Sequence, residues 1–217
     1  MKNFAIFSIS LVIGIVLPFL LIKLTSPASP KSNPTLPVAA PITSKFSLAT
    51  APSESLKGSA VNISGDVEWT SRVATEPAKI TNGQTIQQGE DIVTGTTGNV
   101  TVLFAGDCKI VFDSATEMNF TQTLPSNFVF NQNKGTTTVT KDCINPLSIR
   151  ALHMLIKQQS GEMTLTVDDT DQTLKLNIAS GSAQVAFNDI NNVSTVINVA
   201  ADQTLTYDDP SRTADLE

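Results

Sequence analysis

Hydrophobic and polar residues alternate with a period of two through much of the chain beyond residue 58. In the clearest run, Val100, Val102 and Phe104 alternate with Thr101 and Leu103. Further runs place apolar residues at every second position: Cys108, Ile110 and Phe112; Met163, Leu165 and Val167; Leu174, Leu176 and Ile178; Ala183, Val185 and Phe187. Successive side chains of a strand point to opposite faces, so this pattern predicts strands with one buried and one solvent-facing side.

Short clusters of Gly, Asn, Asp and Ser separate these runs and predict turns. The predicted turns are Ser64-Gly65-Asp66, Thr81-Asn82-Gly83, Gly95-Thr96-Thr97-Gly98, Ala105-Gly106-Asp107, Asn133-Lys134-Gly135 and Ser180-Gly181-Ser182. Many short strands joined by turns predict an all-β fold, as a multi-stranded antiparallel β-sandwich or rolled β domain. Segment 147–158 is a helical candidate, but Ile149, Ala151, His153 and Leu155 also fit a period of two, so we interpret it as a strand.

An uncharged apolar run from Phe4 to Ile22 precedes this pattern and predicts one transmembrane helix. As a helix it would be about 28 Å long, close to the hydrocarbon thickness of a bilayer. The alternative is a cleaved signal peptide, but the run is longer than a typical signal-peptide core and no clear small-x-small site follows it. Lys2 lies on one side, and Lys23 and Lys31 on the other, so charge alone does not orient the helix. The simplest topology is a single-pass membrane protein with its β domain on the extracytoplasmic side.

A proline-rich segment, residues 25–56, follows the apolar run. It holds six of the chain's 11 prolines, with many Ser, Thr and Ala residues between them. Such a composition cannot bury a core and favours extended, solvated backbone. The predicted organisation is a membrane anchor at 1–24, a disordered tether at 25–56, a β domain at 57–208 and a disordered tail at 209–217.

The charge of the chain restricts its possible partners. Charged residues make up 16% of the chain, and a formal net charge of -6 gives a sequence pI of about 4.7. An acidic chain with few Lys and Arg residues cannot neutralise many phosphates, which argues against nucleic-acid binding. The charge argues equally against docking of the domain onto anionic lipid. The predicted anchor and tether favour a partner that is a protein or an envelope polymer.

Two cysteines, Cys108 and Cys143, allow one disulfide in an exported protein. Closing that loop would stabilise the fold by roughly 3–4 kcal/mol. The alternative is two unrelated thiols, and the spacing does not decide between them. Two cysteines and the single histidine, His153, cannot supply a four-ligand zinc site, and we expect no metal or other cofactor.

No group of residues has the pattern of a catalytic site, so we predict a protein that is not an enzyme. His153 has no recognisable nucleophile partner and is expected to be a core or surface residue. The run Asp168-Asp169-Thr170-Asp171 lacks the Gly and closing Glu of a calcium loop, which favours an acidic hairpin tip. Asp208-Asp209 falls at the expected frayed end. Trp69, the single tryptophan, is expected to fill the core, with a ligand platform as the alternative.

Two segments combine turn glycines with alternating apolar residues in a known pattern. Residues 60–69 read Ala-Val-Asn-Ile-Ser-Gly-Asp-Val-Glu-Trp, and Asn82-Gly83 precedes Ile-Gln-Gln-Gly-Glu-Asp-Ile-Val-Thr-Gly at 86–95. The second segment resembles the Gly-Asp-x-Ile-x-Thr-Gly core of the FecR family, named after the regulator of ferric-citrate transport. Residues 99–104, 149–167 and 181–185 resemble its later hairpins, so the resemblance covers about residues 58–207. The motif residues, expected to have a structural role in turns, are Gly83, Gly89, Asp91, Ile92, Thr94 and Gly95.

The chain departs from the family pattern at several places. Glu90 separates Gly89 from Asp91, Ala105-Gly106-Asp107-Cys108 replaces an Asp-Gly-Ser turn, and Ser160-Gly161-Glu162 stands where a Gly-Thr pair is common. Only three residues precede the apolar run, whereas the resemblance would imply a sigma-regulating cytoplasmic domain there. We therefore expect a non-enzymatic binding module at the envelope rather than a transcriptional regulator. The alternative is a sensor subunit that transmits a signal through the membrane helix. A faint internal similarity between 65–69 and 181–185 is attributed to the general likeness of hairpins.

Overall fold

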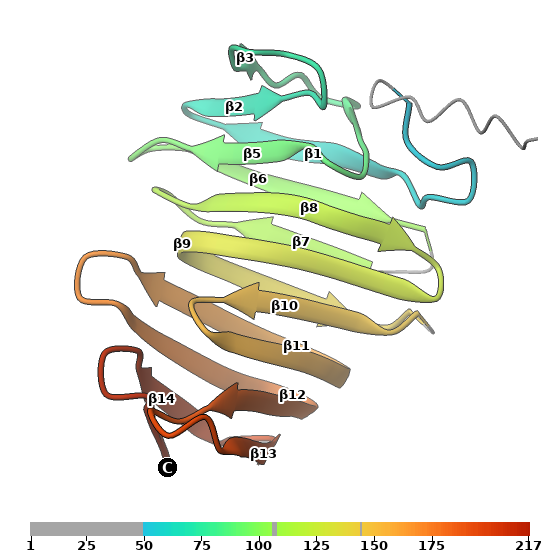
Figure 1. Cartoon of the computed structure of the whole chain (residues 1–217). Helices are drawn as coiled ribbons and strands as arrows, with labels where there is room; N and C mark the ends of the chain where they lie inside the picture. The colour runs from blue at the N-terminus through green and yellow to red at the C-terminus, as the bar shows by residue number, and fades with distance from the viewer. Residues whose placement is uncertain (1–49, 106–107, 144) are drawn as a thin grey trace, which may run out of the picture. The chain divides into compact units, whose positions relative to one another are not determined.

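The computed structural model describes residues 50–105, 108–143 and 145–217, and every regular element in them is a β-strand (Figure 1). The strands are β1 (Gly58–Ser64), β2 (Val67–Thr70), β3 (Ala78–Lys79), β4 (Thr85–Ile86), β5 (Asp91–Thr94), β6 (Asn99–Phe104), β7 (Cys108–Phe112), β8 (Glu117–Leu124), β9 (Asn127–Lys141), β10 (Leu147–Ala151), β11 (Met154–Asp168), β12 (Thr173–Asn188), β13 (Ser194–Ala200), β14 (Thr204–Asp208) and β15 (Thr213–Leu216). The predicted all-β fold is confirmed for this part of the chain. Within these residues no helix is long and apolar enough to cross a membrane. The predicted anchor, Phe4 to Ile22, and residues 25–49 of the predicted tether lie outside the described residues.

The strands form one continuous sheet that folds back on itself into two layers (Figure 1). Three long strands, β9, β11 and β12, give one half to each layer. The first layer has the order β3-β2-β5-β8-β9-β10-β11-β12-β13. The second has the order β4-β1-β6-β7-β9-β11-β12-β14-β15. The layers enclose one hydrophobic core, which makes the domain a rolled sandwich.

One strand pair corrects the expectation of a wholly antiparallel sheet. β9 and β10 run parallel, with Leu147 opposite Phe128 and Ile149 opposite Phe130. β9 begins in the first layer and ends in the second, so the chain must return to the first layer before β10 can start beside the beginning of β9. Because of this crossover, β10 runs in the same direction as the first half of β9.

The alternating residues pack as their pattern predicts. In all five runs identified from the sequence, every residue of the predicted buried set is at most 8% exposed. Five phenylalanines form the centre of the core in β6 to β9, with ring centroids as close as 4.6 Å for Phe104 and Phe128. Edge-to-face contacts of this kind add to the stabilisation that comes from burying the rings.

Glycines stand where the long strands pass from one layer to the other. In β9 the residues that belong to the core are even-numbered before Gly135, at Phe128 and Phe130, whereas the buried residues after it, Thr137 and Val139, are odd-numbered; Val129 is also buried but lies outside the core cluster. β11 and β12 show the same change of parity around Gly161 and Gly181. These three glycines have φ of 82°, 79° and 80°, a conformation that costs other residues free energy. The glycine corners are thus the points at which a continuous strand turns its other face to the core.

These corners correct two of the predicted turns. Asn133-Lys134-Gly135 and Ser180-Gly181-Ser182 lie inside β9 and β12 rather than between strands. The internal similarity between 65–69 and 181–185 also has a structural basis, because Gly65 occupies the corner between β1 and β2 with φ 65°. The similarity therefore marks equivalent corners of the fold, not merely hairpins that look alike.

Both ends of the β domain are more ordered than the sequence suggested. Residues 209–217, expected to be a disordered tail, contain β15, in which Thr213 pairs with Asp208 of β14. At the other end, the Leu56 N–H donates to the Thr123 carbonyl at 2.7 Å, which fixes the end of the predicted tether to β8. In both cases backbone hydrogen bonds order the segment. Such bonds do not require large apolar side chains, so the composition of the segments did not reveal them.

The segment 147–158 forms strands, but in a different register from the one predicted. β10 ends at Ala151 and β11 begins at Met154, with a tight turn between them in which Leu152 has φ 51°. The turn shifts the phase, so that Ile156 is buried and Leu155 is 42% exposed.

Candidate binding site around Trp69

The side chain of Trp69 is fixed by a buried carboxylate. Trp69 lies in β2, packs against the core and is half-buried. Its indole Nε1–H donates to Glu90 Oε2 at 2.9 Å, and the backbone N–H of Gln87 donates to the same oxygen at 2.8 Å. Glu90 is only 3% exposed, so these two donors hold its carboxyl group in place and the indole cannot rotate freely.

Burial makes the carboxyl group of Glu90 a weaker acid than an exposed one. Desolvation raises the pKa of its carboxyl group, and the hydrogen bonds from Trp69 and Gln87 and the nearby Arg72 charge oppose that rise without cancelling it. Glu90 is the residue that interrupts the family-like Gly-Asp motif. In this chain it anchors the tryptophan, a role that its spacing in the sequence did not indicate.

Arg72 contributes a cation beside the indole. Its side chain lies across Gly89, where an added Cβ would be 3.3 Å from Arg72 Cγ and Nε. The Nη1 atom of Arg72 is buried and has no hydrogen-bond partner among the described residues. In the same part of the chain, no carboxylate lies within the 4.0 Å that defines an ion pair with Arg72. Its charge therefore acts on Glu90 at longer range, without an ion pair, while the side chain also lines the neighbouring pocket.

These groups line an open pocket of about 270 Å³. The lining residues are Trp69, Ser71, Arg72, Val73, Gln84, Thr85, Gln87 and Glu90. An aromatic ring, a cation and several amide and hydroxyl groups in one concave place form a typical binding surface. Trp69 thus packs on the core, as one alternative predicted, and it also borders the pocket; its use as a ligand platform stays a prediction.

Residues of the family-like motif lie in the sheet and the turns next to this pocket. Ile92 is fully buried, and Gly83 and Gly89 adopt φ of 82° and 80°. The Thr94 hydroxyl donates to the Asp113 carbonyl at 2.6 Å, and the Thr116 N–H donates to the Thr94 hydroxyl at 2.8 Å.

The remaining motif residues make strand-to-strand contacts. Asp91 accepts a bond from the Asn119 side-chain amide at 2.7 Å, across the pair of β5 and β8. The Gly95 N–H donates to the Asp66 carbonyl at 2.8 Å. Each of these bonds joins elements of the sheet, so the motif positions the pocket without lining it.

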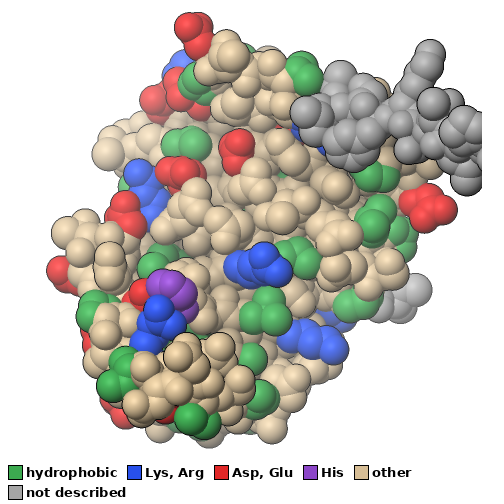
Figure 2. Space-filling model, viewed as in Figure 1, with side chains coloured by type: hydrophobic (Ala, Val, Ile, Leu, Met, Phe, Trp, Pro, Cys, Tyr) green, Lys and Arg blue, Asp and Glu red, His purple; other side chains and the backbone are tan. Residues whose placement is uncertain are grey.

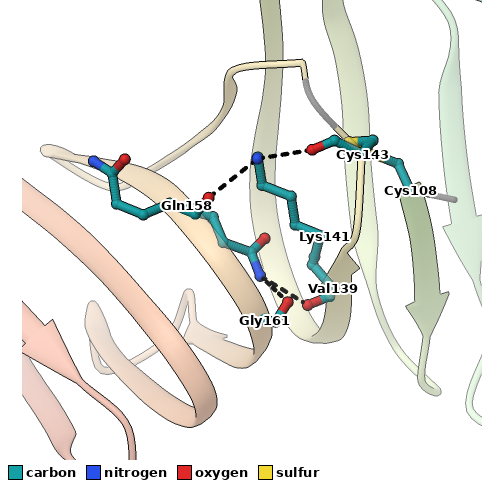
Figure 3. Close-up of a disulfide and its surroundings, with 7 residues drawn as sticks. Cys108, Val139, Lys141, Cys143, Gln158 and Gly161 are labelled. Carbon is teal, nitrogen blue, oxygen red and sulfur yellow. Dashed lines mark hydrogen bonds between the residues drawn. A yellow bond between two sulfur atoms is a disulfide. The ribbon is translucent and has the colours of Figure 1, made fainter. Parts of the chain in front are cut away.

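The two cysteines are joined in a disulfide, as Figure 3 shows. Their Cα atoms are 5.3 Å apart, and both side chains are buried. The bridge fastens β7 to the segment that follows β9. Nearby, the ammonium group of Lys141 donates to the carbonyl oxygens of Cys143 at 3.0 Å and Gln159 at 3.1 Å. The disulfide and Lys141 together close this end of the sandwich.

His153 and Asp209 form a pair that sequence reasoning missed. His153 Nδ1 lies 2.8 Å from both carboxylate oxygens of Asp209, and Arg212 Nε lies 3.7 Å from one of them. Asp209 is 7% exposed, whereas the side chain of His153 is mostly exposed, as the histidine on the surface in Figure 2 shows. The two residues are 56 positions apart, and Asp209 falls in the expected tail, so nothing in the sequence connected them.

The acidic run at 168–171 forms a hairpin tip between β11 and β12. Asp168 accepts hydrogen bonds from the backbone N–H groups of Thr170 at 2.9 Å and Asp171 at 3.1 Å. Its carboxylate is thus used to shape the turn. Among the described residues, no group of three or more His, Cys, Asp or Glu side chains is arranged to hold a metal ion.

Comparison with known proteins shows a likeness of fold only. No model of a known protein family matches the chain, and no curated protein matches it. Two crystal structures of a candidate anti-sigma factor from Parabacteroides distasonis ATCC 8503 are similar, at 2.50 Å and 1.65 Å resolution. Both have a TM-score of 0.50, with identities of 11% and 10%. The match covers 58% of this chain and 58% of the other, so the chain spans little more than half of that protein's length.

Proposed function

We propose that this chain is a non-enzymatic binding module of the cell envelope, and that the pocket around Trp69 takes a short piece of an envelope glycan. The observation that carries the proposal is the fixed indole of Trp69 beside Arg72, which forms no ion pair with a carboxylate of the described residues. A sugar ring has an apolar face that packs on an aromatic ring, and hydroxyl groups that bond to amide, hydroxyl and guanidinium groups. The pocket is lined by all of these groups: the ring of Trp69, the amides of Gln84 and Gln87, the hydroxyls of Ser71 and Thr85 and the guanidinium of Arg72.

The size of the pocket also favours a small polymer unit over a protein surface. A pocket of about 270 Å³ is near the lower limit for small-molecule sites, whereas stable protein–protein contacts are broad and flatter. Glu90 is committed to Trp69 and Gln87, which leaves it as a support of the indole rather than an acid or base for chemistry. The placement on the outer side of a membrane rests on the sequence, through the run from Phe4 to Ile22.

The single tryptophan of the chain provides a direct test. Purified protein would be titrated with soluble glycan fragments released from the envelope, and the fluorescence of Trp69 recorded. We expect a saturable change in intensity or wavelength, and calorimetry with Arg72→Ala should show binding weakened about tenfold or more. Arg150→Ala is the matched control, because Arg150 lines a different pocket. Saturable binding that is unchanged by Arg72→Ala and Trp69→Ala would place the glycan elsewhere, and no binding of any fragment would refute the function.

A regulatory role is the second candidate, and the shared fold with a candidate anti-sigma factor favours it. In that case ligand binding would be transmitted through the predicted membrane helix. The test is to replace residues 4–22 with an unrelated apolar helix that anchors equally well and to compare the transcripts of the two strains. Identical transcripts, with the ligand present and absent, would dispose of the regulatory role while leaving the binding function intact.

A further inference from the structure

The edge strand β13 differs from the other three edges of the sandwich. The first layer ends in β3 and β13, and the second ends in β4 and β15. β3 and β4 are two residues long, and Lys79 of β3 forms an ion pair with Asp66. β15 is four residues long and contains Asp215. Short length and charge are the usual protections of an edge against pairing with another strand.

β13 has none of these protections. Its seven residues, Ser-Thr-Val-Ile-Asn-Val-Ala, include no charge and no proline. All of them pair with β12, from Ser194 opposite Asn188 to Ala200 opposite Ser182, without a bulge. Among the described residues β13 has no other neighbour, so its outer side presents regularly spaced N–H and C=O groups. An edge of this kind is ready to accept another strand.

Apolar side chains accompany the free edge. Val196, on the outward face of β13, is 57% exposed, and Ile190 and Val193 in the loop before it are 71% and 59% exposed. The lower end of the molecule in Figure 2, where β13 lies, shows hydrophobic side chains among uncharged ones, with a few acidic side chains toward its left margin. A second strand laid along β13 would cover part of this apolar surface as well as the backbone groups.

We infer that β13 pairs with β13 of a second copy of the chain, antiparallel and centred on Val196, so that the first layers of two molecules join into one sheet. The uncharged composition of β13 makes a second copy an acceptable occupant. The net charge of -6 disfavours close contact between two copies in general, but β13 is neutral throughout, so no like charges of the two strands would meet along this edge. A two-fold contact between identical surfaces needs a patch that is complementary to itself, and a neutral strand with a central valine satisfies that condition.

Cross-linking tests the register of the pair. In an antiparallel pair, residues directly opposite have Cα atoms about 4.5–5.5 Å apart, which is within reach of a disulfide. The two natural cysteines are already joined to each other, so a new cysteine would be the only free thiol among the described residues. We expect full-length Val196→Cys in detergent micelles to form a covalent dimer on mild oxidation. Leu103→Cys is the control, since Leu103 is also exposed but lies in β6, between β1 and β7.

Light scattering of the same full-length protein measures the mass without a cross-link. We expect the mass of a dimer for the natural sequence and for Leu103→Lys, and the mass of a monomer for Val196→Lys. A monomeric natural protein at every concentration tested would overturn the inference, as would a dimer that persists in Val196→Lys. If Val196→Lys does not fold, the cross-linking result decides: no dimer from Val196→Cys, or equal dimer from Leu103→Cys, counts against pairing through β13. None of these outcomes depends on the glycan pocket.

Discussion

His153 and Asp209 join two distant parts of the chain through three contacts. The Asp209 carboxylate meets the imidazole Nδ1 through both oxygens at 2.8 Å, and it lies 3.3 Å from the backbone nitrogen of His153. His153 forms the turn between β10 and β11 in the first layer, whereas Asp209 follows β14 in the second. The pair therefore links the two layers at one end of the sandwich and holds the C-terminal strands in place.

Removing the Asp209 carboxylate should weaken the fold. We expect Asp209→Ala to lower the free energy of unfolding by about 1–3 kcal/mol, because a buried hydrogen-bonded group is lost and the His153 N–H is left without its partner. Urea unfolding followed by circular dichroism measures the change. Asp215→Ala, at an exposed position of β15, is the control and should alter stability by less than about 0.5 kcal/mol. Equal effects of the two substitutions would mean that the pair does not stabilise the domain.

The corner at Gly181 should tolerate no side chain. Gly181 faces Gly161 across β11 and β12, and an added Cβ would clash with the carbonyl oxygen of Ser160. Gly83 has a similar φ, but an added Cβ there meets nothing within 4 Å. We expect Gly83→Ala to cost only the conformational penalty, about 1–2 kcal/mol, and Gly181→Ala to cost clearly more. The comparison of the two unfolding curves isolates the close approach of the strands, and equal losses would contradict it.

The strands were predictable from the sequence, and the corners were not. Alternation identifies which residues are buried, and it did so correctly in β7, in β12 and in β11 from Met163 onward, but it missed the burial of Thr101 in β6 and the exposure of Leu155 in β11. It does not distinguish a turn that reverses the chain from a corner that passes it to the other layer, because a glycine at positive φ occurs in both, as Gly83 and Gly181 show. Ser180-Gly181-Ser182 has the composition of a turn, yet the pairing of Gly181 with Gly161 keeps β12 continuous.

The candidate site was only partly visible in the sequence. Trp69 stood out as the single tryptophan, and Glu90 as a residue inserted between Gly89 and Asp91 of the family-like motif. Their hydrogen bond forms because β2 and the turn before β5 lie side by side. The period of apolar residues along the chain does not predict which strands become neighbours. Arg72 gave no signal, since an arginine just beyond a strand is ordinary until its neighbours in space are known.

Reduction of the Cys108–Cys143 disulfide should destabilise the domain without unfolding it. The bridge closes a loop with a sequence separation of 35, which corresponds to roughly 3–4 kcal/mol of restricted unfolded-chain entropy. We expect the midpoint of urea unfolding to fall on addition of a reducing agent. A Cys108→Ala, Cys143→Ala double variant should show the lower midpoint with and without reductant. A midpoint of the natural protein that reductant leaves unchanged would show that the bridge contributes nothing.

Glu90 should make stability depend on pH in a direction opposite to that of an ion-paired carboxylate. Burial raises the pKa of Glu90 above 4.5, its ordinary value, so the folded state prefers the protonated acid. That contribution is complete below about pH 4.5 and is lost as pH rises through the raised value. Glu90→Gln keeps an oxygen that can accept from Trp69 and Gln87 but does not ionise. Its stability relative to the natural protein should therefore increase from pH 4 to pH 7, as urea unfolding at each pH would show; a constant or falling difference would contradict the raised pKa.

Tyr207, the single tyrosine, allows a similar argument at alkaline pH with a spectroscopic reading of its own. Its ring is fully buried beside Phe187, at a centroid distance of 5.2 Å. Burial, together with the negative charge of Asp209, raises the pKa of the Tyr207 hydroxyl to about 12 from an ordinary value of 10.0. The folded state thus favours the neutral phenol, and this contribution to stability is present below pH 10 and is lost as pH rises toward 12. We expect the ultraviolet absorbance of phenolate to be absent from the folded protein at pH 10.5 and present in the urea-unfolded chain at the same pH. Tyr207→Phe should keep the packing and lose less stability between pH 9 and pH 11 than the natural protein; phenolate in the folded protein near pH 10 would show that the hydroxyl is open to solvent.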